Sequence, residues 1–211
     1  MKKVKFIVFI CLFILLPLAY FNGFIRISDL TSEQESIAKK YGGVYVFDEK
    51  LEREIDKREE ERRIMTKGLS GKKLAENRYA VDMTPVNEKL PRVLSNGKRY
   101  YVTTRDYGND FKKQAWIPER YSDLIVNYIG KDYEKFKPSM SFDYFYVDND
   151  QIVPISLSVT YSYKVAKFGL FGDEASGIRF KEIYYSYVIG GNRFEFINNK
   201  FEKVSTSDKD K

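Results

Sequence analysis

The sequence predicts an α+β domain that follows a single N-terminal transmembrane helix. Three observations support this prediction. The chain opens with three lysines and an apolar run long enough to cross a bilayer. Aromatic residues make up 16% of the 211 residues, and most are Tyr and Phe, which suit the pleated surface of a sheet. Polar and apolar residues alternate from Ser156 to Val165, as expected for a strand with one buried face.

The apolar segment extends from Phe6 to Ile25 and is interrupted by one Asn-Gly pair. As a helix it would measure roughly 30 Å, the thickness of the hydrocarbon core. Lys2, Lys3 and Lys5 precede the segment, and a positive flank stays in the cytoplasm. A cleaved signal peptide is the alternative, although no Ala-x-Ala pattern offers a cleavage site. Both alternatives place the folded domain on the far side of the membrane.

Two helices are expected directly after the anchor. Thr31 and Gln34 have the spacing of a capping box, which predicts a helix that ends at Tyr41 before a Gly-Gly stop. The run 51–63 is almost entirely charged, so we expect a solvated helix held by Glu–Lys and Glu–Arg pairs. A coiled-coil arm is disfavoured because apolar heptads are missing. The following stretch, 66–77, is expected to be a mobile loop.

Strands dominate the second half of the chain. One helix is expected there at Pro118–Ile129, which has apolar residues at helical spacing and Gly130 as its stop. Three hairpins are predicted where turn residues separate two strand-like runs. They are 91–94 with 98–104 across Asn96-Gly97, 141–147 with 152–165 across Asp148-Asn149-Asp150, and 178–189 with 193–197 across Gly190-Gly191-Asn192.

We therefore expect an antiparallel sheet of about five to seven strands with one or two packed helices. A short apolar run at 44–47 is a further strand candidate. The composition along the chain divides it into four regions. They are a membrane anchor or signal segment at 1–25, a helical charged membrane-proximal region at 26–77, an antiparallel-sheet α+β domain at 78–202, and a disordered tail at 203–211.

The composition excludes several kinds of chemistry. The chain contains no His, which removes the commonest general base and metal ligand. Its only cysteine, Cys11, lies in the apolar segment, so no thiolate is available in the domain for a metal or cluster. Neither a cofactor nor a metal is expected. The net charge of +6 arises from 36 basic and 30 acidic residues that are mixed along the chain, and we expect no nucleic-acid partner.

Two short patterns resemble catalytic or metal motifs but lack their context. Ser70 and Lys73 have the Ser-x-x-Lys spacing in which an amine one helical turn away takes the proton of a hydroxyl. The companion motifs of that chemistry are missing, and a helix is not predicted there. Asp148 and Asp150 have the spacing that opens a calcium loop, but the glycine and glutamate of that loop are absent. A turn explains these two acids better.

The residues expected to contact a partner are Phe168, Leu170, Phe171 and Trp116. The first three are large apolar side chains in a glycine-flanked segment, which we expect to be a loop between two long strands. Trp116 precedes Pro118 and is either an aromatic anchor for a partner or a hinge packed under the following helix. The alternative for all four residues is that they fold back onto the core.

These observations favour a non-catalytic protein-interaction module tethered to the bacterial inner membrane and facing the periplasm. Its partner would be another envelope protein or a secreted effector, as for an immunity-type protein or an envelope-assembly subunit. Tethering raises the local concentration of the domain near membrane-bound partners. The alternatives are an envelope hydrolase that uses Ser/Lys or carboxylate chemistry, and a carrier of lipid or another small ligand. The oligomeric state does not follow from the sequence.

Overall fold

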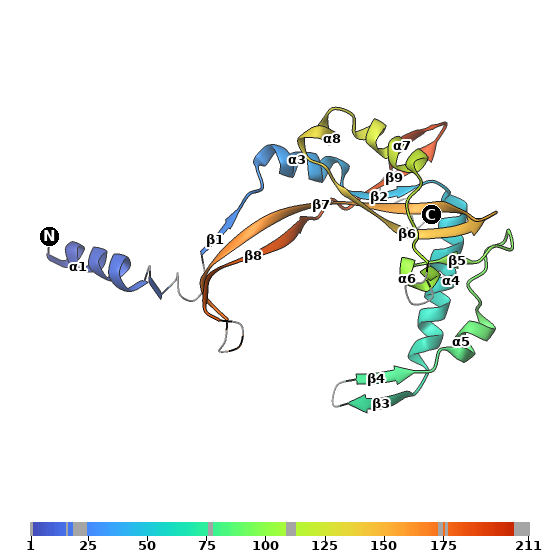
Figure 1. The fold of residues 1–211 in the computed structure, drawn as a ribbon, viewed down its shortest axis with the longest axis horizontal. Coiled ribbons are helices and arrows are strands. Elements are labelled where there is room, and N and C mark those ends of the chain that lie inside the picture. The colour runs from blue at the N-terminus through green and yellow to red at the C-terminus, as the bar shows by residue number, and fades with distance from the viewer. Residues whose placement is uncertain are drawn as a thin grey trace.

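The computed structural model describes residues 2–15, 17–18, 25–75, 78–108, 113–172, 175 and 177–204. These residues form an arch (Figure 1). A long arm of sheet extends toward the N-terminal helix on one side, and a leg built around a long helix stands on the other side.

The N-terminal segment is helical near its start and then changes to a strand. α1 (Lys2–Ile10) is followed by a π-helical turn, η1 (Cys11–Leu15), and positions 16 and 19–24 lie outside the described residues. In the part of the chain that the structure describes, no helix has both the length and the apolar character needed to cross a membrane. The transmembrane helix predicted over 6–25 is therefore not supported. Ile25 lies in a strand because its backbone pairs across a sheet.

Among the described residues, eight strands form one sheet. They are β1 (Ile25–Ser28), β2 (Gly43–Val46), β5 (Tyr100–Tyr101), β6 (Ser139–Asp148), β7 (Gln151–Phe171), β8 (Arg179–Val188), β9 (Asn192–Ile197) and β10 (Lys200–Val204). Their order is β10-β9-β2-β7-β6-β5, and β1 and β8 pair with the second half of β7. All of these pairings are antiparallel except β2–β9, which is parallel.

The α+β prediction is confirmed, but the sheet has eight strands and is mixed rather than antiparallel. The hairpin across Asp148–Asp150 is confirmed, with Asn149 and Asp150 in left-handed backbone conformations. The hairpin predicted across Gly190–Asn192 is wrong, because β8 pairs with β7 whereas β9 pairs with β2 and β10. Lys203 and Val204 belong to β10, and the rest of the predicted disordered tail lies outside the described residues.

Two Gly-Gly pairs bring β2 and β9 together. A Cβ atom on Gly190 would lie 2.1 Å from the carbonyl oxygen of Gly42, and one on Gly43 would lie 2.0 Å from that of Asn192. The side-chain amide of Asn192 also donates to the carbonyl oxygens of Lys39 and Gly42, both at 2.7 Å. This close approach requires residues without side chains. Gly42 and Gly43 therefore allow β2 to pair with β9 in addition to ending the preceding helix.

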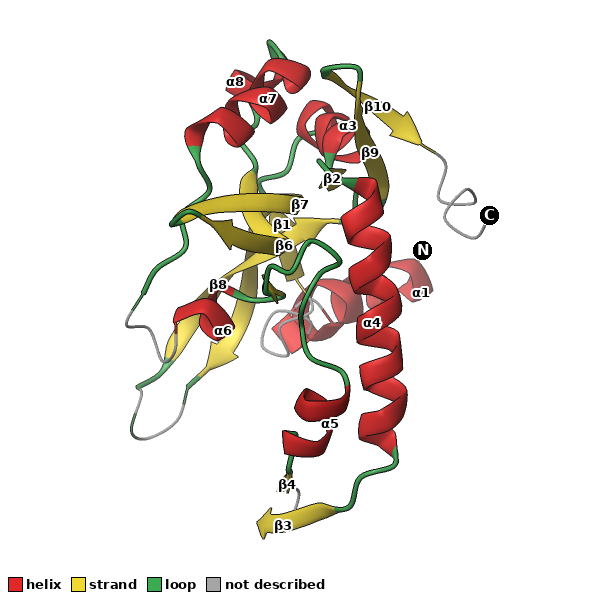
Figure 2. Ribbon diagram, turned by 90° about the vertical axis from the view of Figure 1, so that its right-hand side faces the viewer, coloured by secondary structure: helices red, strands yellow, loops and turns green. Residues whose placement is uncertain are grey.

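Three helices cover the outer face of the sheet: α3 (Ser32–Tyr41), α7 (Glu119–Ile129) and α8 (Asp132–Lys135) (Figure 2). The first two were predicted. Thr31 and Gln34 form the expected capping box, and Gly130 follows α7 with a positive φ. Their apolar sides pack on one large cluster that includes Tyr45, Leu157 and Tyr161. The alternation along β7 is thus confirmed for its apolar face.

The leg begins with α4 (Glu49–Lys67), which crosses the inner face of the sheet. Ile55 of this helix is fully buried with Ile155, Leu94 and Tyr100. The helix predicted at 51–63 and its Glu–Arg pairs are confirmed, for example Glu60–Arg63, but the expectation that it is solvated is wrong for the side that carries Ile55. The same contact explains why Ser156, expected on a wet face, is completely buried.

The rest of the leg folds against or beyond α4. Its elements are β3 (Gly71–Ala75), β4 (Arg78–Val81), α5 (Thr84–Lys89) and α6 (Thr104–Gly108). The loop predicted at 66–77 is wrong where the structure describes it, because α4 continues to Lys67 and β3 pairs with β4. The predicted 91–104 hairpin keeps its Asn96-Gly97 turn and one bridge, Val93–Arg99, but β5 pairs with β6.

Candidate functional site

The arm of the arch leaves one face of its sheet uncovered. Beyond Tyr161, the described sheet consists of β1, β7 and β8, with β7 in the middle. Residues directly opposite one another in antiparallel strands share a face. Ile27, Ala166 and Ile183 therefore form one row across the three strands, on the inner side of the arch. No described helix is packed over this row, whereas α3 contacts the sheet on the outer side.

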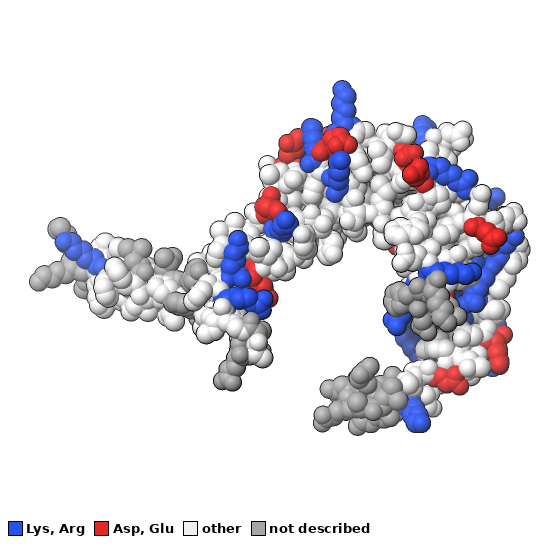
Figure 3. Space-filling view, viewed as in Figure 1, with Lys and Arg blue, Asp and Glu red and all other residues white. Residues whose placement is uncertain are grey.

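Large apolar side chains stand exposed along this inner side, together with the charged side chain of Lys164, which lies directly opposite Tyr185. We call this surface the concave apolar face and define it by Ile27, Ile183, Tyr185, Tyr187 and Ile189. Their exposed fractions range from 57% for Ile183 to 90% for Ile189. Figure 3 shows the hollow of the arch, where white surface predominates under the arm and most coloured side chains lie on the outer side and the leg. Side chains of this size are rarely left in water in a row unless they bind something.

A hollow lies at the root of the concave apolar face. It has a volume of about 440 Å³ and a mostly apolar lining. Its lining includes Tyr187 and Ile189 from the arm, Val44 of β2, Thr160 of β7, Glu52 of α4 and Arg193 of β9. The hollow extends the concave apolar face toward α4, so an occupant of the face would reach the leg.

A buried ion pair fixes the far side of this hollow. The guanidinium of Arg193 donates to both carboxylate oxygens of Glu52, with Nη1 to Oε1 at 3.0 Å, and its Nε donates to Glu195 at 2.9 Å. The Arg193 and Glu52 side chains are 8% and 4% exposed. Burial alone would lower the pKa of Arg193, but the hydrogen bonds that it donates to the carboxylates of Glu52 and Glu195 outweigh this effect and raise that pKa. The pair joins β9 to the first turn of α4.

The outer edge of β8 is open in the described sheet, because β7 is the only strand that pairs with it. Its sequence from Ile183 to Ile189 is IYYSYVI and contains no charge, proline or glycine. Exposed edges are ordinarily protected by such residues, because unpaired N–H and C=O groups recruit other strands. This edge is therefore suited to accept a further strand.

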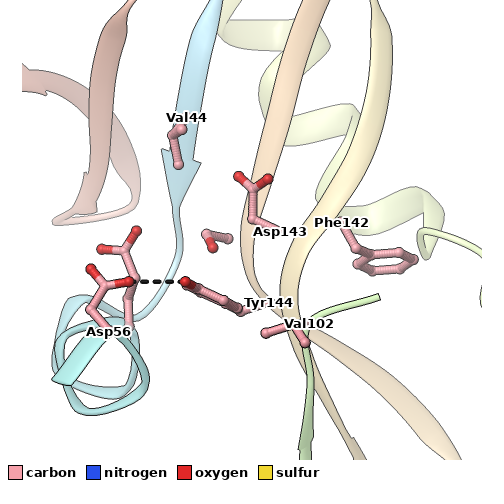
Figure 4. Close-up of a pocket in the computed structure, with 8 residues that line it drawn as sticks. Val44, Asp56, Val102, Phe142, Asp143 and Tyr144 are labelled. Atoms are coloured by element: carbon pink, nitrogen blue, oxygen red, sulfur yellow. Dashed lines mark hydrogen bonds between the residues drawn. The ribbon is translucent and has the colours of Figure 1, made fainter. Parts of the chain in front are cut away.

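A second, polar cavity of about 300 Å³ lies between α4 and β6 (Figure 4). Asp56 on α4 and Tyr144 on β6 point toward one another, and the tyrosine hydroxyl donates to the carboxylate at 3.0 Å. The hydroxyl of Ser158 donates to the carboxylate of Asp143, whose two oxygens lie 2.7 and 2.8 Å from Ser158 Oγ. Burial raises the pKa of Asp143, and the carboxylates of Glu52 and Asp56 add to this effect.

The polar cavity also contains an unsatisfied hydroxyl. Ser156 Oγ is buried against the cavity and has no hydrogen-bond partner among the described residues. The described residues contain no cluster of His, Cys, Asp or Glu suited to a metal ion. The cavity can hold water or a small polar group, and it combines an acid of raised pKa with nearby carboxylates, as general acid–base catalysis requires.

The residues expected to contact a partner lie at opposite ends of one strand. β7 continues to Phe171, so Phe168, Leu170 and Phe171 lie at the end of this strand rather than in a loop. The pairing of β7 with β8 has a bulge between Phe168 and Phe171. Leu170 is 53% exposed, whereas the other two are half-buried. The predicted strand ended at Val165, because the glycines beside Phe168–Phe171 indicated a loop.

Trp116 is 73% exposed and stands beside the start of β7. With Pro118 and Arg120 it lines a cavity of about 510 Å³ next to the β6–β7 turn. The twenty-one residues of β7 separate it from Phe171, so the four predicted residues do not form one site. The sequence also missed the stripe on β8, although an uncharged run of seven residues could have indicated an unprotected edge.

The two catalytic or metal patterns are placed as follows. Ser70 is exposed in the turn between α4 and β3, and Lys73 lies within β3. The two residues are therefore not one helical turn apart. Asp148 ends β6 and pairs with Lys98 at 2.6 Å, and Asp150 lies in the β6–β7 turn.

The fold and its surfaces define the chain as an arched α+β protein with an uncovered apolar sheet face and an open strand edge. No protein-family model, no curated protein and no solved structure matches the chain.

Proposed function

We propose that the chain is a membrane-tethered, extracytoplasmic binding module whose concave apolar face receives an extended segment of another protein. The observation that carries this proposal is the stripe of Ile183, Tyr185, Tyr187 and Ile189, all more than half exposed, beside an open strand edge. The partner is another envelope protein or a secreted effector, and the module acts without catalysis.

The side chains of the stripe favour a protein partner. Burial of a large apolar side chain contributes about 1.5–3 kcal/mol when it is complete. Tyrosine is also enriched among the residues that dominate binding energies, because its ring buries a large area and its hydroxyl still finds a partner. Tyr185 and Tyr187 stand two residues apart on the same face, as side-chain pockets for an added strand require.

Strand addition explains the edge and the face together. A segment paired with β8 would satisfy the free backbone groups of that edge, and its alternate side chains would lie on the concave apolar face. The hollow of about 440 Å³ at the root of the arm would then take a large apolar side chain of the partner. Backbone pairing supplies affinity, and the hollow supplies selectivity.

The proposed location is the bacterial inner membrane, with the N-terminus in the cytoplasm and the domain in the periplasm. The apolar segment from Phe6 and the three lysines before it support this location. An immunity-type protein that neutralises an incoming effector fits this arrangement, as does a subunit of an envelope assembly. Cleavage of the segment would leave the domain free in the periplasm.

Co-purification from membranes tests the binding proposal. The full-length chain should recover a specific partner, and Tyr185→Asp should abolish recovery because it puts a charge on the concave apolar face. Tyr184→Asp is the matched control, since Tyr184 points to the outer face and should leave recovery unchanged. Equal recovery with both variants would remove the concave apolar face from the proposal.

A carboxylate-dependent hydrolase is the second candidate, and the raised pKa of Asp143 beside two other acids favours it. In that role Asp143 would donate a proton, and Asp56 would act as base or electrostatic stabiliser. Release of soluble products from purified peptidoglycan or phospholipid, lost in Asp143→Asn, would support hydrolysis. No release at any pH would remove this candidate.

A further inference from the structure

We propose that the free end of the β7–β8 arm binds the anionic surface of the membrane. We call this end the basic-aromatic tip. It consists of Lys167, Phe168, Leu170, Phe171, Ile178, Arg179, Phe180 and Lys181.

Strand pairing places the tip next to the N-terminal apolar segment. Ile25, the last residue of that segment, is the direct partner of Phe168 across β1 and β7. Neighbouring strands lie about 4.8 Å apart. A bilayer that holds the apolar segment therefore meets the tip as soon as the chain leaves it, and Figure 1 shows the end of the arm on the same side as α1.

The apolar side chains of the tip are open to solvent. Leu170, Ile178 and Phe180 are 53%, 69% and 56% exposed, and no described element covers them. Two aromatic rings lie under ammonium groups, with Lys167 Nζ at 5.2 Å from the ring of Phe171 and Lys181 Nζ at 5.7 Å from that of Phe168. A cation above an aromatic ring matches the interface, where charges meet headgroups and rings lie just below.

Charge complementarity indicates an anionic lipid surface. Segment 164–182 has four basic residues and three acidic ones, and Arg26 on β1 adds a fifth basic residue directly opposite Lys167. Glu182 lies opposite Lys167 on the other side, so the charges at this end of the arm still have a basic excess. Each Lys or Arg near an anionic leaflet contributes about 1 kcal/mol. The tip thus has the two features of a peripheral membrane contact: a few apolar side chains that insert, and a basic rim that is attracted to the headgroups.

Docking of the tip would have a consequence for binding. The tip and the apolar segment would hold the arm at two points, so the concave apolar face would keep a fixed height and direction above the membrane. This inference rests on the membrane tethering of the proposed function but not on the identity of any protein partner.

Depth-dependent quenching of a fluorophore tests the contact in the full-length chain. Leu170→Cys in a Cys11→Ala background carries an environment-sensitive label, and the protein is reconstituted in phosphatidylcholine vesicles with or without phosphatidylglycerol. Thr160→Cys is the matched control, because it is exposed on the same strand ten residues away, roughly 30 Å along β7. Spin-labelled lipid serves as the membrane quencher and iodide as the aqueous one.

The expected result is several-fold stronger lipid quenching at position 170 than at 160, greatest with phosphatidylglycerol. Lys167→Gln and Lys181→Gln should each lower the docked-to-undocked ratio by roughly five-fold in anionic vesicles. If the chain still floats with the vesicles but lipid quenching is equal at positions 170 and 160, the tip contact is overturned and the tether is not. Failure to float would overturn both.

Discussion

Arg193 and Glu52 determine, at the scale of single residues, how the sheet meets the leg. Each is charged, nearly fully buried and bonded to the other through two hydrogen bonds. Removing one partner leaves the other charge buried without compensation, which costs far more than losing an exposed pair.

We predict that Arg193→Met lowers the free energy of unfolding by about 3–5 kcal/mol, because Glu52 is left unpaired in the interior. The double variant Glu52→Leu/Arg193→Met should recover most of this loss. Urea denaturation followed by circular dichroism measures both. Glu35→Gln, which breaks the exposed Glu35–Lys39 pair, is the control and should not change stability. If Arg193→Met were as stable as Glu35→Gln, the Arg193–Glu52 pair would not be buried in solution.

Asp143 gives a second prediction at the same scale. Its pKa is raised above the ordinary 3.8 by burial, so the folded chain binds this proton more tightly than the unfolded chain does. The contribution of Asp143 to stability is therefore full below pH 3.8 and falls as pH rises through its folded pKa. Asp143→Asn should lack this decline and gain stability relative to the natural chain as pH rises. Parallel stability curves for the two proteins across this range would contradict the assignment.

At the scale of elements, the glycine contacts between β2 and β9 predict that the stability cost of a Gly→Ala substitution depends strongly on which glycine is replaced. Gly190→Ala should destabilise the protein by about 1–3 kcal/mol or more, because its methyl group would meet the Gly42 backbone. Gly68→Ala is the matched control, since its Cβ would meet only Met65 O at 3.5 Å. Thermal unfolding of both variants measures the difference. Comparable melting temperatures would show that β2 and β9 do not approach so closely.

Elements with local signals could be predicted from the sequence, and those that depend on distant contacts could not. The capping box at Thr31, the helix after Pro118 and the turn at Asn149-Asp150 are fixed by neighbouring residues and are confirmed. β2 matches the strand candidate at 44–47, whereas β1 was not predicted. Both strands pair with residues more than a hundred positions away, so their partners could not be predicted from a turn. The charge run of α4 concealed its burial, because Glu59 pairs with Arg92 of a separate segment as well as with Arg62 on the same helix.

At the scale of the whole molecule, β7 sets both the shape and the proposed activity. Its first half is enclosed between helices on both faces, and its second half extends as the arm with one face bare. The alternation along β7 indicated a sheet, but it did not indicate where α4 stops covering the inner face of that sheet. The concave apolar face could therefore not be predicted, because it depends on the position of α4 rather than on the sequence of β8.

The account depends on contact between the concave apolar face and another protein. Site-specific photo-crosslinking in cells tests it most directly, with a photoreactive phenylalanine analogue at position 185 or 184 of the full-length chain. We predict a discrete adduct from 185, on the inner face, and none from 184, on the outer face. Adducts of equal yield from both positions, or adducts from 184 alone, would contradict it.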